Sequence, residues 1–192
     1  MSSSDITKRA LAEALKSLSR SRSFDRITIA DICEACGVNR QTFYYHFSDK
    51  FALVTWIFER ELIREFRENL TFENWDKKLC KLLETMKASR HFYQGVLTQS
   101  AFPWFQDDLF RSTRGLLLEI VTRVDENSAM RTDGINLLVD FYTYGVVGLI
   151  LQWARTGMGD EPNILILKIQ SLIIESRQFT LELFSALEKG ER

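Results

Sequence analysis

Proline and glycine are scarce in this chain of 192 residues, which contains only two prolines and nine glycines. So few breaking residues leave little sequence for loops, which excludes a chain made mostly of irregular structure. Hydrophobic residues make up 45% of the chain and charged residues 27%, so a real core can be buried. The length permits one or two small domains.

Cysteine is also rare. Cys33, Cys36 and Cys80 form an odd set, and no disulfide framework is expected. Cys33 and Cys36 form a CxxC, which is compatible with half a zinc site or a redox pair, but a second pair with the right spacing is absent and Cys80 does not complete four ligands. Packing of these cysteines in the core is favoured instead. We predict neither a metal nor a cofactor.

Signals for secretion or membrane insertion are missing. The start "MSSSDITKR" lacks the apolar core of a signal peptide, and the most apolar run, residues 144–154, is far too short to cross a bilayer. A Gly-rich phosphate loop, HExxH, GxSxG and a paired-carboxylate motif are absent as well. We therefore expect a soluble cytoplasmic protein that is not an enzyme and does not contact a membrane.

Charge of one sign does not dominate either, since the net charge is −1. Its distribution is uneven: residues 1–50 hold eight Lys and Arg against six Asp and Glu, a net charge of +2, while residues 101–150 hold four against seven, a net charge of −3. The N-terminal part of the chain is therefore the part suited to an anionic partner.

Apolar residues recur at helical spacing along the whole chain, which predicts an all-α fold. Ser4, Thr28, Asn39 and Ser48 are available as N-caps, and Gly37 supplies a left-handed helix exit. Two short helices joined by a Gly-containing turn, following a longer one, make a helix-turn-helix unit. The N-terminal helices are expected at about 5–21, 29–36, 40–46 and 49–69.

The segment "GVNRQTFYYHFSDK" (37–50) crowds aromatic and polar side chains together. In a helix that begins at Arg40, Phe43 and Phe47 lie on one side, while Arg40, Gln41, Tyr44 and Tyr45 spread over the other. Arg and Gln match guanine and adenine edges in a major groove, and Tyr and Lys suit phosphates. The segment is therefore predicted to be a recognition helix for double-stranded DNA.

The stretch "FDRITIADICEACGVNRQTFYYHFSDKFALVTW" (24–56) resembles the helix-turn-helix of the TetR family of bacterial transcriptional regulators, with "TFYYHF" and the following Lys as its most specific element. One departure is Ser23, where many members have glycine. The resemblance implies phosphate contacts by Thr28, Tyr44, His46 and Lys50, and base or groove contacts by Arg40, Gln41, Thr42 and Tyr45. Asn39 completes the predicted DNA-binding set.

The rest of the chain reads as helices near 74–88, 90–99, 103–124, 132–156 and 162–188. The resemblance implies a DNA-binding domain at 1–50 and a regulatory and dimerisation domain at 51–192, connected by the helix at about 49–69. It also implies a homodimer in which the last two helices form a four-helix bundle with a second subunit. The interface residues would be Gly145, Gly148, Ile166, Ile169, Ile173 and Phe184.

An effector pocket is implied in the same domain. Its candidate lining residues are His91, Phe102, Trp104, Phe105, Phe110, Phe141, Tyr142 and Trp153. An aromatic stripe at helical spacing is more often core than pocket, and for His91 a surface or capping role is at least as common. The stretch "FYTYGVVGLILQWARTGM" (141–158), with the N-terminal motif, is similar to a subfamily typified by activators of dihydroxyacetone kinase operons. This implies that the signal is either a small-molecule effector or a coactivator protein.

These observations predict a DNA-binding transcriptional regulator. Two helix-turn-helix units of a dimer would enter successive major grooves of a palindromic operator, about 34–36 Å apart. The alternative is a helical metal-binding or enzymatic protein that merely begins like a helix-turn-helix protein.

Overall fold

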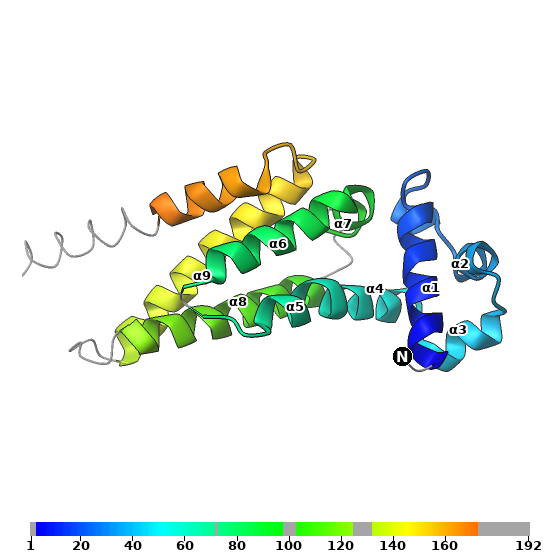
Figure 1. Cartoon of the computed structure of the whole chain (residues 1–192), viewed down its shortest axis with the longest axis horizontal. Coiled ribbons are helices and arrows are strands. Elements are labelled where there is room, and N and C mark those ends of the chain that lie inside the picture. Colours follow the sequence, from blue (N-terminus) through cyan, green and yellow to red (C-terminus); the bar gives the residue numbers. More distant parts are fainter. Residues whose placement is uncertain (1–2, 72, 98–102, 125–131, 173–192) are drawn as a thin grey trace, which may run out of the picture. The chain divides into compact units, whose positions relative to one another are not determined.

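The computed structural model describes residues 3–71, 73–97, 103–124 and 132–172, and every regular element in these ranges is a helix (Figure 1). The predicted all-α class is confirmed. The chain divides into two compact units, residues 1–159 and residues 160–192. The second unit is described from residue 160 to residue 172 and contains a helix over 162–172. Lys168 Nζ on this helix lies 2.6 Å from Oδ2 of Asp160, which precedes the helix.

Three helices and one short turn form the N-terminal part of the first unit. The first helix begins at Ser3, so the predicted cap Ser4 lies inside it, and it ends at Leu18 instead of near residue 21. The hydroxyl of Ser19 donates to the Leu15 carbonyl at 2.8 Å, which satisfies a carbonyl at this helix end. The elements are α1 (Ser3–Leu18), the 3₁₀ turn η1 (Phe24–Arg26), α2 (Ile29–Cys36) and α3 (Arg40–His46).

The helix predicted over 49–69 is built from three consecutive elements, α4 (Lys50–Phe58), η2 (Glu59–Ile63) and α5 (Arg64–Arg67). Its N-cap is Asp49 and not Ser48, because the Asp49 carboxylate accepts the backbone N–H of Ala52 at 2.8 Å. The middle element η2 is a π-helix. Single π-helical turns inside α-helices are rare and are frequently found at functional sites.

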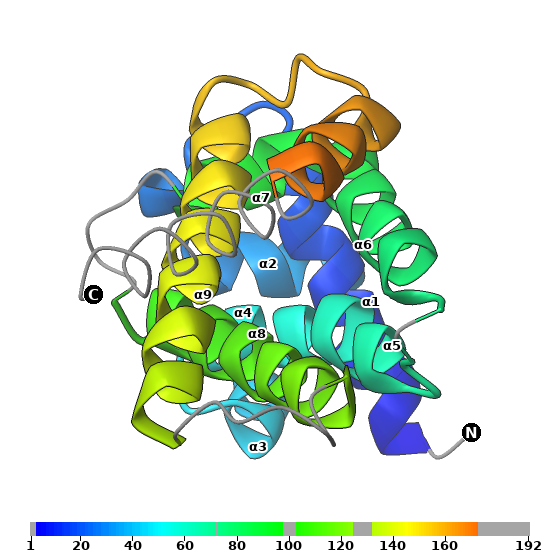
Figure 2. The same ribbon diagram turned by 90° about the vertical axis from the view of Figure 1, so that its left-hand side faces the viewer.

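Four helices complete the first unit: α6 (Trp75–Ala88), α7 (Arg90–Leu97), α8 (Pro103–Val124) and α9 (Thr132–Arg155). The helix α8 packs along α9, α7 packs on both α9 and α6, and α6 packs on α5 (Figures 1 and 2). Arg114 on α8 joins α9 through hydrogen bonds of 2.6 Å to Asp140 and 3.0 Å to Asn136. The N-terminal helices are attached to these helices through α4 and through a contact of α1 with α7.

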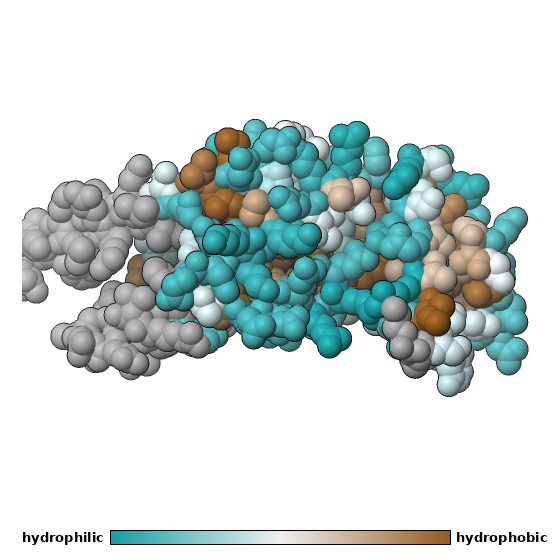
Figure 3. Space-filling model, viewed as in Figure 1, coloured by the Kyte–Doolittle hydropathy of each residue, from teal (hydrophilic) through white to brown (hydrophobic). Residues whose placement is uncertain are grey.

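Hydrophilic residues predominate on the face shown in Figure 3, where hydrophobic residues occur in small patches. Within α9, the segment Ile135–Arg155 is nevertheless long and apolar enough by composition to cross a membrane, with a mean hydropathy of 1.4. The expectation based on residues 144–154 alone therefore considered only part of this helix. Length and composition are weak evidence for a span, since core helices of soluble proteins pass the same test, and α9 packs on α7 and α8.

Candidate nucleic-acid interface

The turn between α2 and α3 fixes where the recognition helix begins. Gly37 ends α2 in the left-handed region with φ of 70°, which glycine adopts without a steric penalty. Two residues later, Asn39 Oδ1 accepts the backbone N–H of Thr42 at 2.7 Å and the Thr42 hydroxyl at 2.9 Å. Because Asn39 caps the helix, α3 begins at Arg40, as the sequence predicts.

One side of α3 is buried, as its periodicity predicts. Phe43 is 0% exposed and Phe47 is 6% exposed. The two rings lie 5.9 Å apart between centroids, and the Phe47 ring lies 6.1 Å from the ring of Trp56 on α4. The recognition helix is therefore attached to α4 by an aromatic cluster.

The other side of α3 faces solvent. Tyr44 is 56% exposed and Tyr45 is 83% exposed. Arg40 and Gln41 are exposed too, and across the described residues their side chains take part in no hydrogen bond or ion pair. The half-buried His46 stacks edge-on against Tyr45, with ring centroids 5.0 Å apart. One exposed helix face thus carries the side chains of Arg40 and Gln41, unpaired among the described residues, beside exposed aromatic rings.

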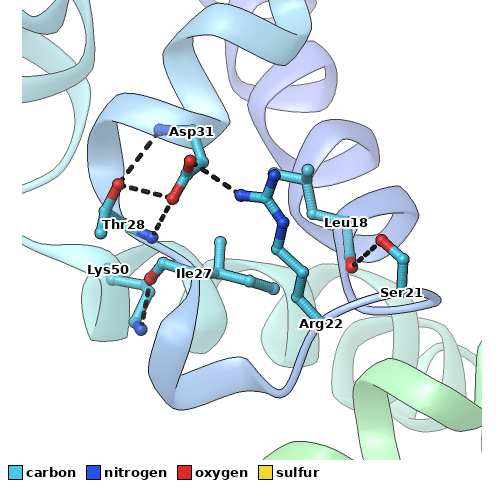
Figure 4. Close-up of polar contacts among 7 residues, drawn as sticks. All are labelled: Leu18, Ser21, Arg22, Ile27, Thr28, Asp31 and Lys50. Atoms are coloured by element: carbon cyan, nitrogen blue, oxygen red, sulfur yellow. Dashed lines mark hydrogen bonds and ion pairs between the residues drawn. The ribbon is translucent and has the colours of Figure 1, made fainter.

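Thr28 forms a capping box with Asp31 at the start of α2 (Figure 4). Its hydroxyl donates to Asp31 Oδ2 at 2.6 Å and accepts the Asp31 N–H, while its own N–H donates to the same carboxylate at 2.8 Å. Arg22 adds a hydrogen bond of 2.9 Å to Asp31. The Thr28 hydrogen bonds, followed by Arg22, lower the pKa of Asp31. A phosphate contact by Thr28 would require one of these bonds to be released.

Lys50 is also bound internally. Its ammonium donates to the carbonyls of Phe24 and Ile27, each at 2.7 Å, and lies 4.2 Å from the centroid of the Phe24 ring. Burial lowers the pKa of Lys50. These contacts fasten the beginning of α4 to the turn η1, and Figure 4 shows the one to Ile27.

The departure from the family pattern at Ser23 has no steric consequence. Ser23 adopts an extended conformation with φ of −63° and ψ of 144°, which any residue adopts. The turn between α1 and α2 therefore does not require glycine at this position.

The two cysteines on α2, Cys33 and Cys36, contribute to the packing of the N-terminal helices. Cys33 is buried and Cys36 is half-buried, and burial raises the pKa of both thiols. Within the part of the chain that the structure describes, no group of three or more His, Cys, Asp or Glu side chains is placed to hold a metal ion.

The residues predicted to line an effector pocket are spread over several helices. His91 is exposed at the start of α7, where it lines a surface pocket. Phe110 stacks on Tyr144 with ring centroids 4.4 Å apart, Phe141 is 69% exposed beside Tyr142, and Trp153 is 5% exposed. Phe102 and the side chains of Trp104 and Phe105 lie outside the described residues. The pocket formed by these aromatic residues stays a prediction.

An exposed apolar stripe runs along α9. Leu137 is 73% exposed, Phe141 69% and Tyr144 68%, and their spacing places them on one helix face. The predicted interface residues Gly145 and Gly148 continue this stripe, and a Cβ at either position would meet no atom within 4 Å. The interface predicted from the sequence does not include Leu137 or Tyr144, although the i,i+4,i+7 pattern is present.

The predicted interface residues of the last helix are only partly described. Ile166 and Ile169 lie on the helix over 162–172, but their side chains are buried within the chain, at 6% and 1% exposed, so they are not available to a second subunit in this conformation. Ile173 and Phe184 lie outside the described residues. The exposed apolar side chains of this helix are a different set, namely Ile164, Leu167 and Leu172.

Comparison with known proteins distinguishes a transcriptional regulator from the alternative of a helical metal-binding or enzymatic protein. Residues 11–55 match the family described as "Bacterial regulatory proteins, tetR family", and residues 73–175, more than half of the chain, match the family described as "Transcriptional regulator C-terminal region". The chain belongs to the TetR family of transcriptional regulators. The resemblance seen in the helix-turn-helix motif is confirmed.

Two curated helix-turn-helix regulators are similar in sequence. DhaS of Lactococcus lactis, an activator of the dhaKLM operon, is 32% identical over 96 residues, which cover 50% of this chain and 51% of DhaS. The regulator YxbF of Bacillus subtilis is 25% identical over 194 aligned positions, which cover 94% of this chain and 47% of YxbF. The chain thus spans about half the length of the curated relatives it matches.

Solved structures share the fold. The dihydroxyacetone kinase operon activator DhaS has a TM-score of 0.74 at 21% identity, with 91% of this chain and 97% of that chain covered. Thermus thermophilus FadR, a TetR-family repressor in complex with lauroyl-CoA, has a TM-score of 0.55 at 19% identity, with 88% and 93% covered. At these identities the likeness establishes the fold of this TetR-family chain.

Proposed function

We propose that this regulator binds a palindromic DNA operator as a homodimer in the bacterial cytoplasm, and that a ligand or a coactivator protein controls its affinity through the helices after α4. The observation that carries the proposal is the two-sided helix α3. Its buried side, Phe43, holds it against the protein, while Arg40, Gln41, Tyr44 and Tyr45 extend from its exposed side.

The exposed residues of α3 divide by chemistry. Arg40 and Gln41 carry planar donor and acceptor groups that match base edges in the major groove, and they have no internal partner in the described part of the chain. Tyr44 and His46 offer donors to phosphates, and Tyr45 and Thr42 face the groove wall. Thr28, Asn39 and Lys50 are occupied by capping bonds or by η1, so their part is to hold α2, α3 and α4 in register.

The dimer would form through the stripe on α9. Leu137, Phe141 and Tyr144 expose a contiguous apolar surface, and Gly145 and Gly148 beside it permit the close approach of a second helix. The helix over 162–172 would contribute Ile164, Leu167 and Leu172, with Ile173 and Phe184 following along the chain. Burial of such a surface between two copies removes apolar area from water.

Effector binding would change the affinity for DNA through contacts between α1 and the π-helical turn η2. Asp5 on α1 pairs with Arg60, and Lys16 on α1 lies 2.7 Å from Glu61 Oε1. Both partners lie in η2, so a change at the helices packed on η2 alters the position of α1 and of the recognition helix. The coupling free energy between an effector site and a second binding site, here the DNA-binding face, is typically about 1–3 kcal/mol.

Selection of bound sequences from a random pool of double-stranded DNA tests the proposal, with the solution mass of the protein recorded alongside. A palindromic consensus with half-sites about 10 bp apart, bound by a dimer, is the expected result. The double variant Arg40→Ala/Gln41→Ala is the control that should lose the enrichment. Failure of the folded, dimeric wild type to enrich any sequence at low salt, with or without cell extract, would refute operator binding.

A further inference from the structure

A pocket lies on the side of α1 that faces away from the recognition helix. In Figure 1, α1 stands between α7 on one side and α2 and α3 on the other, and α1 contacts all three helices. The pocket has a volume of about 260 Å³ and lies between α1 and the junction of α6 with α7. Its polar lining residues include Lys16, Ser17 and Arg20 from α1 and Ser89, Arg90 and His91 from the junction.

Two arginines of this lining have no ion-pair partner in the part of the chain that the structure describes. Arg20, Arg90 and His91 are exposed, and in the described ranges their side chains form no hydrogen bond or ion pair. Glu13 is the one acidic residue of the lining, and it is bound to Lys16, with Nζ 2.7 Å from its Oε1. Two guanidinium groups thus line one pocket with no acidic partner among the described residues.

The lining defines the chemistry of a ligand. Arginine side chains bind phosphate and carboxylate oxygens through paired N–H groups, and the hydroxyls of Ser17 and Ser89 and the imidazole of His91 add donors from both walls. A tetrahedral phosphoryl group has more acceptor oxygens for donors on two walls than a planar carboxylate has. The volume lies below the roughly 300–1,000 Å³ of pockets for drug-sized ligands, which favours a small, polar molecule.

We propose that this pocket binds the phosphoryl group of a small metabolite, with Arg20 on α1 and Arg90 on α7 as its two charge partners. The ligand would join α1, which packs on α2 and on the predicted recognition helix α3, to the helices of the regulatory part. The site is new relative to the aromatic residues predicted for an effector pocket, because the lining residues of the two sets share only His91.

A polar network beside the pocket leads to the π-helical turn. Lys16, which lines the pocket, binds Glu61 of η2 at 2.7 Å, and the other oxygen of Glu61 accepts the hydroxyl of the buried Tyr93 on α7 at 2.9 Å. A phosphoryl group in the pocket would act on Lys16 and hence on the contact between α1 and η2. The consequence for DNA rests on the proposed function, whereas anion binding does not.

Binding of inorganic phosphate to the full chain tests the site directly. Titration calorimetry at constant ionic strength should show saturable binding of one phosphate per chain. Arg90→Ala and Arg20→Ala should each weaken it at least about tenfold, since a hydrogen bond to a charged group is lost. The matched control is Lys81→Ala, which removes one exposed positive charge from α6 outside the pocket lining and should leave binding unchanged. Arg90→Lys keeps the charge and should still weaken binding.

The results that would overturn the proposal are equally direct. Absence of saturable phosphate binding by the folded wild type would refute the site, as would equal weakening by Lys81→Ala and Arg90→Ala. Acetate that binds more tightly than phosphate would refute the phosphoryl assignment. Circular dichroism melting of each variant shows whether the fold is intact.

A second arm measures operator affinity with and without phosphate. An affinity change of at least about fivefold in the wild type, and none in Arg20→Ala/Arg90→Ala, is expected. Phosphate binding without operator binding would refute the proposed function and leave the site standing. Operator binding without phosphate binding would refute the phosphate site and leave the proposed function standing.

Discussion

The ammonium of Lys50 contacts Phe24 twice, as a hydrogen-bond donor to its carbonyl at 2.7 Å and as a cation 4.2 Å from its ring centroid. A further bond to Ile27 gives Lys50 three contacts with the segment that joins α1 to α2. Since α3 lies between α2 and α4 in the chain, these contacts help to hold the two helices that flank it. The part proposed for Lys50 is therefore structural, whereas the family resemblance implies a phosphate contact.

Lys50→Met keeps the aliphatic stem and removes the ammonium. We expect it to lower the free energy of unfolding by about 1–2 kcal/mol, because two carbonyls lose a charged donor. Chemical denaturation measures this loss, and Lys81→Met, which removes an exposed lysine from α6, is the control. A Lys50→Met variant with wild-type stability and a flatter salt dependence of DNA binding would indicate a phosphate contact alone.

Arg40→Ala and Gln41→Ala should relax the sequence preference, at a cost of about 1–3 kcal/mol for the preferred base pair. Tyr44→Ala should instead weaken binding to all sequences equally, because phosphates carry no sequence information. Competition binding with single-base operator variants separates the two effects. Arg40→Lys is the matched control, which keeps the charge and loses the planar fork. An unchanged preference in Arg40→Ala would show that the reading face is assigned wrongly.

Phe43→Ala should destabilise the protein by about 3–5 kcal/mol, because the ring is completely buried and its removal leaves a cavity. The loss is measured by chemical denaturation. Tyr44→Ala removes a neighbouring ring that is 56% exposed, and it should cost much less. Similar losses for the two variants would contradict the division of α3 into a buried and an exposed side.

Phe141→Glu should shift the protein from dimer to monomer, because it places a charge in the proposed α9 interface. We expect a loss of about 2 kcal/mol or more in dimerisation free energy, measured by sedimentation equilibrium. Ile6→Glu makes the same change at a residue of α1 that is 59% exposed, and it should leave the dimer intact. A dimer unaffected by Phe141→Glu would exclude this stripe from the interface.

Tyr93 should make the protein sensitive to alkali. Burial, followed by the nearby Glu61, raises the pKa of Tyr93 well above its usual value of 10.0. Above about pH 10 the unfolded chain releases a proton that the folded chain retains, so the free energy of unfolding falls as the pH rises further. Tyr93→Phe should reduce this slope in denaturation curves recorded against pH. Tyr45→Phe, on the exposed face of α3, should keep the wild-type slope, and an unchanged slope in Tyr93→Phe would contradict the prediction.

The bounds of α2 and α3 were predictable because their signals are local. Thr28 and Asn39 cap through residues three positions further on, and Gly37 ends α2 by its own backbone conformation. The cap of α4 was assigned to the wrong one of two adjacent residues, Ser48 and Asp49. Both residue types cap helices, and only the backbone conformation places the Asp49 carboxylate on the Ala52 N–H.

The sequence by itself determined the helical class, the position of the recognition helix and its two faces, because spacing within a few residues encodes each of them. Tertiary structure alone decided that Lys50 binds a turn 26 residues away and that Arg20 and Arg90 meet at one pocket. Such contacts depend on how helices pack, and side chains remote in sequence leave no periodic signal of their meeting. The residues on the exposed face of α3 were therefore predictable from their order in the sequence. The residues that hold α3 in place and connect it to other helices became visible only in the folded chain.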